Sequence, residues 1–373
     1  MSRDSYSTWI NVDLDAIEKN VSILASRTGV LVMAVVKANA YGHGIIPAAG
    51  AALRGGAKWL GVARLEEALT LRAAQFTGPI LVMGYIPENS FQAAAVNDIS
   101  VTIWSSEQIQ SLALMTGNLG TPIKVHLKFD TGMSRLGAPG TEALSLAKQI
   151  AGTHKVLFEG IFTHYARADE LDLSSAKDQQ REFLEILDRI NRAGINPPWV
   201  HAANSAGSLI LEDSRFSLIR PGISIYGLHP SQVRSLPVDF RASLEWKAAL
   251  SQVKVLPAGR GVSYGHEYIT QKDERIGTIP VGYADGFRRV PGNQVLVGGK
   301  LVPVVGRVCM DQVCVQLDQV PGAKTGDEVV IIGAQGDLQI SAEQVADRWG
   351  TINYEVVCGL ADRVPRQYVP SVD

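Results

Sequence analysis

Cysteine is scarce in this chain, and its placement excludes the structures that cysteine usually stabilises. The three cysteines, Cys309, Cys314 and Cys358, are odd in number and show no CxxC spacing. The sequence therefore predicts neither a disulfide framework nor a zinc knuckle, and we expect no bound metal. A reducing cytoplasm suits such a composition.

Long apolar runs and an excess of charge of one sign are also missing. No apolar run approaches the roughly 18 residues that span a bilayer, and residues 1–6 lack the apolar core of a signal peptide. The net charge is −2, so no basic field exists to attract nucleic acid or anionic lipid. We expect a cytoplasmic protein with no nucleic-acid or membrane partner.

The first part of the chain alternates short apolar runs with longer amphipathic stretches, which is typical of parallel βα units. The candidate strands are residues 30–36, 59–63, 79–84, 99–104, 123–129, 157–163, 198–203 and 217–220. Helical patterns cover residues 14–25, 65–74, 107–115, 142–151 and 175–193. Eight such units predict a (β/α)8 barrel of the TIM type. An open doubly wound sheet is the alternative, although no GxGxxG motif follows the first strand.

Because 373 residues exceed one ordinary core, we expect a second domain. After residue 238 the apolar runs become short and are separated by glycine and proline. Residues 295–302 indicate a hairpin closed on Gly298-Gly299, and Ser341 with Gln344 forms a capping box for a helix. The predicted division is a barrel over residues 1–238 and a mainly β domain over residues 239–373.

Lys37 ends the apolar run 30–36 and opens a glycine-rich loop, residues 41–44. Barrel enzymes place their chemistry at this end of the strands. Apolar neighbours can desolvate the amine and favour its neutral form, the nucleophile that forms Schiff bases with carbonyls and with pyridoxal phosphate. A lysine whose ammonium merely reaches water remains the alternative.

Polar side chains also follow the strands predicted over 198–203 and 217–220. Asn204 and Ser205 offer an amide and a hydroxyl, and Pro221-Gly222-Ile223 resembles the first turn of a helix. In barrels the loops after these two strands often form a phosphate site, although simple turn chemistry would produce the same residues. A phosphate-bearing carbonyl cofactor beside Lys37 indicates pyridoxal phosphate.

Arg220 is the last residue of the strand predicted over 217–220 and directly precedes Pro221. In such a site it could donate to the pyridine nitrogen of the cofactor. Since a guanidinium keeps its protons, that nitrogen would not readily acquire one. The ring would then be a weaker electron sink, which favours simple removal and return of a proton over transamination.

Nine motifs carry a family resemblance that runs nearly from end to end. They are VVKANAYGHG (35–44), DTGMSRLG (130–137), THYA (163–166), RPGI (220–223), VSYG (262–265), VGYADG (281–286), GRVCMD (306–311), TINY (351–354) and RVPR (363–366). The chain thereby resembles the alanine racemase family. The resemblance implies a (β/α)8 barrel, a β-rich second domain, pyridoxal phosphate and a homodimer with shared active sites. It also implies interconversion of L-alanine and D-alanine for cell-wall peptidoglycan.

The resemblance also implies the role of each site residue. Lys37 would hold the cofactor as a Schiff base and act on D-alanine, while Tyr264 of the partner subunit would act on L-alanine. Arg135 would contact the substrate carboxylate and the phenolic oxygen of the cofactor, and the backbone of the partner's Met310 would help to hold that carboxylate. The cofactor phosphate would be bound by Tyr41, Ser205, Gly222, Ile223 and Tyr354, beside the Asn204 already noted. His164 would lie at the cofactor and link Arg220, which faces the pyridine nitrogen, to Tyr264. The substrate entryway would be lined by Asp169, Tyr283, Arg288 and Arg307, and Lys128 matches a lysine that is often carbamylated in this family.

One residue departs from the family pattern: Ser134 stands where the commonest motif has glycine, which puts the loop's dihedral angles in question. Three other functions stay open. A basic amino-acid decarboxylase resembles this architecture, but Cys309-Met310-Asp311 and Arg220 argue against it. A racemase of broader specificity, acting on serine as well, is nearer. A non-catalytic cofactor-binding protein would resemble the barrel alone.

Overall fold

The structure, a computed structural model, describes residues 6–116 and 121–369. The first five residues, part of the segment in which we found no signal sequence, lie outside that description. The chain divides into two compact units, residues 15–241 and residues 1–14 with 242–373.

Residues 15–241 form the predicted barrel. Its parallel strands are β2 (Leu31–Val35), β3 (Trp59–Val62), β4 (Ile80–Val82), β5 (Ser100–Ile103), β6 (Ile123–Lys128), β7 (Val156–Phe162), β8 (Trp199–His201) and β9 (Leu218–Ile219). They run in the order β8-β7-β6-β5-β4-β3-β2-β9. Backbone hydrogen bonds from Ser217 N to Val200 O (3.1 Å) and from Arg220 N to Ala203 O (2.9 Å) link the two ends of this order. The predicted fold class is confirmed.

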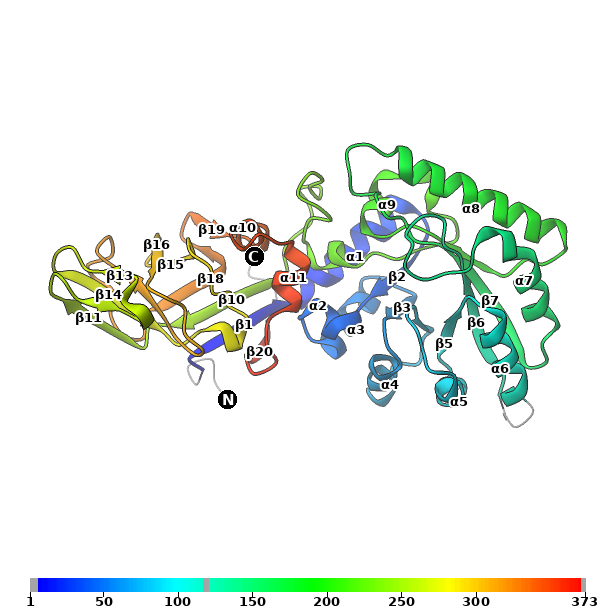
Figure 1. The fold of residues 1–373 in the computed structure, drawn as a ribbon, viewed down its shortest axis with the longest axis horizontal. Helices are drawn as coiled ribbons and strands as arrows, with labels where there is room; N and C mark the ends of the chain where they lie inside the picture. The colour runs from blue at the N-terminus through cyan, green and yellow to red at the C-terminus, as the bar shows by residue number, and fades with distance from the viewer. Residues whose placement is uncertain (1–5, 117–120, 370–373) are drawn as a thin grey trace. The chain divides into compact units, whose positions relative to one another are not determined.

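Helices surround the strands of the barrel (Figure 1). They are α1 (Leu14–Thr28), α2 (Lys37–Tyr41), α3 (Ile45–Arg54), α4 (Leu65–Ala73), α5 (Phe91–Val96), α6 (Ser106–Thr116), α7 (Ala143–Gly152), α8 (Ser174–Arg192) and α9 (Ser205–Ile210). Inside, Met33, Trp59, Leu81 and Leu218 form a buried cluster. Burying each such side chain stabilises the fold by roughly 1.5–3 kcal/mol, so the interior is a packed core.

The other unit is mainly β, and it differs from the predicted division at the N-terminus. β1 (Thr8–Asp13) pairs antiparallel with β10 (Leu244–Ala249) and parallel with β20 (Arg366–Val369). Ile10 and Val12 of β1 are fully buried. The predicted division therefore differs from the structure at residues 6–14, because β1 forms its hydrogen bonds and buries its apolar side chains in the other unit.

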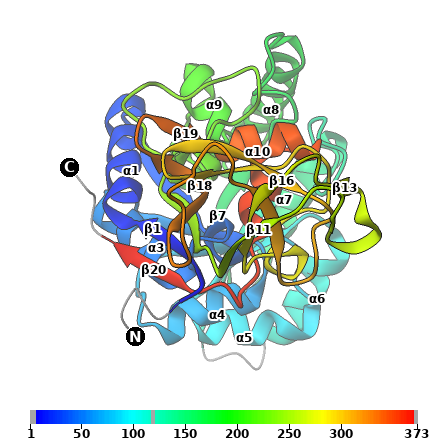
Figure 2. The same ribbon diagram turned by 90° about the vertical axis from the view of Figure 1, so that its left-hand side faces the viewer.

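The sheet of this unit runs in the order β11-β14-β17-β16-β15-β18-β10-β1-β20, and β19 pairs with β18. Its remaining strands are β11 (Gln252–Leu256), β14 (Glu274–Ile279), β15 (Gln294–Val297), β16 (Lys300–Val305), β17 (Val313–Gln316), β18 (Glu328–Gln335) and β19 (Leu338–Ile340). β12 (Gly261–Val262) and β13 (Tyr268–Ile269) form a separate hairpin. α10 (Ala342–Trp349), which lies beside β18 and β19 in both Figure 1 and Figure 2, begins at the predicted capping box, and α11 (Asn353–Cys358) follows.

Candidate active site

Lys37 begins a left-handed turn at the end of β2. The four residues after it, Ala38, Asn39, Ala40 and Tyr41, all have φ between +52° and +54°. This conformation costs roughly 1–2 kcal/mol for each residue other than glycine. The sequence predicted only a glycine-rich loop here. Strain of this size persists only where surrounding contacts impose it, and it collects at functional sites.

Glu67 in α4 supplies one of those contacts. One of its carboxylate oxygens accepts a hydrogen bond from Ala38 N (2.6 Å), and the other accepts from Ala63 N (2.8 Å) and Arg64 N (3.1 Å). A single carboxylate therefore joins the residue after Lys37 to the start of a neighbouring helix. Glu67 was not among the predicted site residues, because nothing in its local pattern shows that it faces this turn.

Asn39 and His43 hold the far side of the turn. Asn39 Oδ1 accepts from Ile45 N (2.8 Å), the first residue of α3. The fully buried His43 ring lies with Nδ1 within 3.0 Å of Ala40 O and 2.9 Å of Tyr41 O, and it stacks on Tyr226 at 4.4 Å. Several contacts along this one segment thus fix the positions of Lys37 and Tyr41.

A small anion cradle lies beside Tyr41. Gly222 N (2.9 Å) and Ser224 N (3.3 Å) both donate to the hydroxyl of Ser205. A Cβ on Gly222 would lie 2.4 Å from the Tyr41 hydroxyl, so only glycine leaves room there. Within the described residues the buried Ser224 hydroxyl has no hydrogen-bond partner. The two N–H bonds hold Ser205 against the turn at Gly222–Ser224, and the orphaned Ser224 hydroxyl is a donor that fits a phosphate group.

Asn204 caps the helix that begins at Ser205. Its side-chain oxygen accepts from Gly207 N (2.9 Å) and caps α9, and its Nδ2 donates to Tyr165 O (3.4 Å). These two hydrogen bonds fix the amide of Asn204 and so position the adjacent Ser205. Ile223 follows Gly222 and is fully buried.

Lys128 ends β6 in a cluster of cations. Burial, assisted by the charges of Arg220, Arg135 and Lys37, lowers the pKa of Lys128 to about 8. The side chain is 5% exposed and its ammonium lies 5.5 Å from the centre of the Phe162 ring. A fraction of this amine is therefore neutral near pH 7.5.

The loop that carries Arg135 is held by Asp130. The Asp130 carboxylate accepts from Gly132 N (3.0 Å) and Ser134 N (2.9 Å). Ser134 has φ +55°, so the position where the family motif has glycine does require a left-handed residue. The two hydrogen bonds to Asp130 help the serine to adopt it.

Arg220 is 3% exposed and is surrounded by acceptors. Its Nη1 contacts His201 Nδ1 at 2.8 Å, and its Nη2 contacts Thr163 O (2.7 Å), Ala202 O (2.9 Å) and His164 Nδ1 (3.2 Å). Burial lowers the pKa of Arg220 to about 9. Burial and the charge of Arg220 also hold the pKa of His164 well below its usual range. His164 is therefore neutral and, because its Nδ1 accepts from Arg220, it carries its proton on Nε2.

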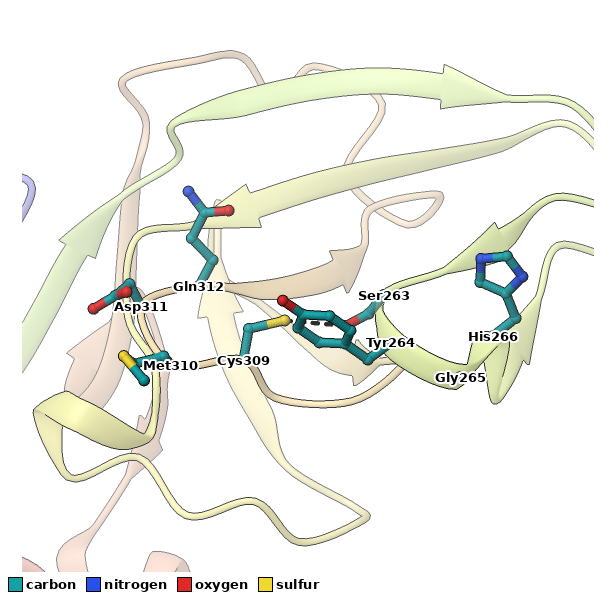
Figure 3. Close-up of a pocket in the computed structure, with 8 residues that line it drawn as sticks. All are labelled: Ser263, Tyr264, Gly265, His266, Cys309, Met310, Asp311 and Gln312. Carbon is teal, nitrogen blue, oxygen red and sulfur yellow. Dashed lines mark hydrogen bonds between the residues drawn. The ribbon is translucent and has the colours of Figure 1, made fainter.

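Tyr264 and Met310 project from two loops of the β unit (Figure 3). They line a hollow of about 630 Å³ and are 70% and 53% exposed. Ser263, next to Tyr264, has φ +64°. Its hydroxyl donates to Arg307 O (2.5 Å) and lies 3.2 Å from Cys309 Sγ. The two loops are thus tied together with Tyr264 presented outward.

The residues predicted to lie on the substrate's way in are held by ion pairs and close packing. Arg307 pairs with Glu267, and Arg288 pairs with Glu355. Tyr283 N donates to Cys309 O (3.1 Å), and a Cβ on Gly282 would lie 2.1 Å from Met310 O. Gly282 therefore permits the close approach that fixes the Met310 backbone.

The predicted site residues divide between the two units. The barrel unit brings together Lys37, Tyr41, Lys128, Arg135, His164, Asn204, Ser205, Arg220, Gly222 and Ile223, and it also carries Asp169, whose backbone oxygen accepts from Ser231 (2.8 Å). The β unit carries Tyr264, Tyr283, Arg288, Arg307, Met310 and, in α11, Tyr354. Neither unit alone contains both Lys37 and Tyr264.

Both units of the chain match known protein families. Residues 12–230 match the family described as "Alanine racemase, N-terminal domain", and residues 243–368 match "Alanine racemase, C-terminal domain". This chain belongs to the alanine racemase family. The alanine racemase of Desulfovibrio desulfuricans is 43% identical over 365 residues, covering 97% of this chain and 98% of that protein. The alanine racemase of Geobacillus kaustophilus is 44% identical over 365 residues, with 96% and 94% covered.

Solved structures of alanine racemases have the same fold. The Bacillus anthracis enzyme with bound L-Ala-P superposes with a TM-score of 0.92 at 41% identity, covering 97% of this chain and 95% of that one. A histidine racemase from Leuconostoc mesenteroides has a TM-score of 0.89 at 28% identity, with 98% of each chain covered. This member of the alanine racemase family is an isomerase. None of its helices within 6–116 and 121–369 is long and apolar enough to cross a membrane.

Proposed function

We propose that this racemase interconverts L-alanine and D-alanine with pyridoxal phosphate, and that it supplies D-alanine for cell-wall peptidoglycan from the cytoplasm. The left-handed turn carries the proposal, because it places Lys37 and the hydroxyl of Tyr41 on one rigid segment beside the anion cradle. A covalent anchor on the same segment as a residue of the phosphate site suits one cofactor that bears both an aldehyde and a phosphate.

The barrel residues would divide the work of holding pyridoxal phosphate. Lys37 would be joined to it, Tyr41, Ser205, Gly222 and Ile223 would bind its phosphate together with Tyr354, and Arg220 would face the ring nitrogen. When bound, the cofactor supplies the electron-withdrawing ring that makes the Cα proton of an amino acid acidic. Arg220, which is fixed by two carbonyls and two histidines, would keep a positive donor at the ring nitrogen.

Racemisation needs a base on each face of Cα. Lys37 would exchange a proton on the face that D-alanine presents, and Tyr264 would do so on the other. His164 would donate its Nε2 proton to the Tyr264 oxygen, since its Nδ1 is already accepting from Arg220. This hydrogen bond stabilises a deprotonated oxygen and so favours Tyr264 as a base. Arg135 and the Met310 backbone would hold the substrate carboxylate, and Asp169, Tyr283, Arg288 and Arg307 would line its way in.

We further propose a homodimer in which Tyr264 and Met310 serve the partner's barrel. Mixing Lys37→Ala and Tyr264→Phe subunits tests this sharing. If each site combines two subunits, a hybrid dimer contains one intact site, and random exchange should restore about a quarter of the native activity. If each chain completes its own site, no hybrid is active and the mixture stays inactive. Dilution below the dissociation constant of the native dimer should likewise abolish activity.

Lys128 is proposed to be carbamylated, which would place an anion beside Arg135. Its neutral amine would attack CO2, form an N–C bond and release one proton. Because the pKa of Lys128 is lowered to about 8, the carbamate should increase as pH rises from 6 to 8. Carbon-13 NMR with labelled bicarbonate should show a carbamate signal that Lys128→Met removes and Lys124→Met, on the same strand, retains. Absence of the signal throughout that range would contradict the modification.

The direct test of the function is incubation of the pure protein, loaded with pyridoxal phosphate, with D-alanine, followed by chiral analysis. We expect the two enantiomers to reach equal concentration. A racemase of broader specificity is the second candidate, favoured by the likeness to a histidine racemase; serine and histidine in the same assay distinguish the two. Retention of the cofactor absorbance without racemisation of any of these amino acids would favour a binding protein.

A further inference from the structure

A chain of hydrogen bonds leaves Arg220 and crosses the interior of the barrel. Arg220 Nη1 lies 2.8 Å from His201 Nδ1, His201 Nε2 lies 2.9 Å from His126 Nδ1, and His126 Nε2 lies 3.2 Å from a carboxylate oxygen of Glu159. Both histidines are fully buried. These hydrogen bonds connect the proposed ring-nitrogen donor, through two histidines, to the carboxylate of Glu159.

The direction of every proton in this chain follows from its two ends. A guanidinium only donates, so His201 Nδ1 accepts and the neutral ring carries its proton on Nε2. That proton points to His126, whose Nδ1 accepts and whose Nε2 therefore donates to Glu159. An ionised carboxylate only accepts, so both ends agree on one arrangement. Burial, with the charge of Arg220, holds the pKa of both histidines below the usual range, which keeps the two rings neutral.

A local irregularity of the barrel makes room for this contact. Val125 pairs with Phe158 and His126 pairs with Gly160, so Glu159 is an extra residue in β7. Such a bulge turns a side chain toward a new direction. A Cβ on Gly160 would lie 2.4 Å from His126 Nδ1, so the imidazole occupies the space that glycine leaves. Bulge and glycine together bring a carboxylate and an imidazole to hydrogen-bond distance.

Glu159 is held in its charged form. Although burial raises its pKa, hydrogen bonds from His126 and Ser100 hold the pKa of this carboxyl below its usual range. Its side chain is 16% exposed. Among the described residues the hydrogen-bond partners of Arg220 are neutral groups. Glu159 is therefore the anion to which the buried cation is connected by hydrogen bonds.

We propose that Glu159 is a positioning residue for the racemase, acting through His126 and His201 on Arg220. This inference rests on the proposed role of Arg220 at the ring nitrogen. With a carboxylate at the end of the chain, only one pair of tautomers satisfies every group. Without the carboxylate, only the contact with Arg220 selects this pair. A glutamine can donate to His126 Nε2 and so satisfy the reversed pair, in which His201 Nδ1–H faces Arg220 N–H. Two donors cannot share a hydrogen bond, so the guanidinium would shift from its place.

The test compares Glu159→Gln with Glu159→Asp and with Asp98→Asn. Glutamine keeps the size but can donate as well as accept, whereas aspartate keeps the charge. Asp98 pairs with Lys124 at 2.6 Å. Its replacement removes one carboxylate that is not part of the hydrogen-bonded series from Arg220 to Glu159. Solid-state nitrogen-15 NMR of holoenzyme labelled in its histidine rings reports the tautomers, and kcat, KM and the visible absorbance of the cofactor are measured on the same samples.

In the native enzyme His126 and His201 should both be Nε2–H tautomers. This result needs no variant and no racemase activity. Glu159→Gln should add the Nδ1–H form, shift the cofactor absorbance and lower kcat by about 10–100-fold with little change in KM, the size of loss found when the partner that orients a metal-ligating histidine is removed. Glu159→Asp should restore part of kcat, and Asp98→Asn should resemble the native enzyme. Native tautomers with native kcat in Glu159→Gln, or an Nδ1–H His201 in the native enzyme, would overturn the proposal. Failure of the native enzyme to racemise would overturn the proposed function alone.

Discussion

Replacing Lys37 with alanine should abolish the visible absorbance of bound cofactor and lower the racemisation rate by at least about 10⁴-fold, because both the anchor and one base are lost. The left-handed turn leaves no other lysine on this segment to take its place. Absorbance after gel filtration and chiral analysis of alanine measure the two losses separately.

The matched control is Lys58→Ala, which removes an exposed lysine just before β3. It should keep both the absorbance and the activity. If Lys37→Ala instead retained the absorbance through gel filtration, Lys37 could not be the residue that holds the cofactor. The contacts of the cofactor phosphate around Ser205 would then have to retain the cofactor without a covalent bond.

Changing Tyr264 to phenylalanine should slow proton exchange at one enantiomer of alanine and spare it at the other. Exchange of the Cα hydrogen of L-alanine with solvent deuterium should fall by roughly 10²–10⁴-fold, the usual contribution of a positioned base. Exchange at D-alanine should survive, since Lys37 serves that face. Net racemisation should fall in both directions, because a complete turnover needs both bases.

Proton NMR in deuterium oxide follows both exchanges, and Tyr85→Phe is a suitable control because Tyr85 is an exposed tyrosine, 59% accessible, outside the proposed site. An equal loss of exchange at both enantiomers would contradict the assignment of one base to each face. Loss at D-alanine alone would reverse it.

Much of the barrel could be predicted because its information is local. Each of the eight strands lies where a short apolar run occurs, and α10 begins at Ser341 as its capping box predicts. Several elements were missed, two of them for clear physical reasons. α3 carries Pro47 in its first turn, where the missing N–H is harmless. β1 is a six-residue run whose partners, β10 and β20, lie more than 230 residues further on.

The site shows the same division between local and distant information. Lys37, Ser205 and Arg220 follow predicted strands, and strand ends of a parallel barrel meet at one face. The capping role of Asn204, the carboxylate of Glu67 and the connection from Arg220 to Glu159 depend on which side chains face one another. That arrangement comes from the closing of the barrel and from one bulge in β7.

By itself, therefore, the sequence determined which residue types stand at the ends of the strands, because apolar periodicity reports each strand locally. It also carried motifs specific enough for the family to be recognised. Only the tertiary structure decided the left-handed turn after Lys37, the unit to which β1 belongs and the proton on each buried histidine. These depend on hydrogen bonds between residues far apart in the chain, whose direction no local pattern encodes.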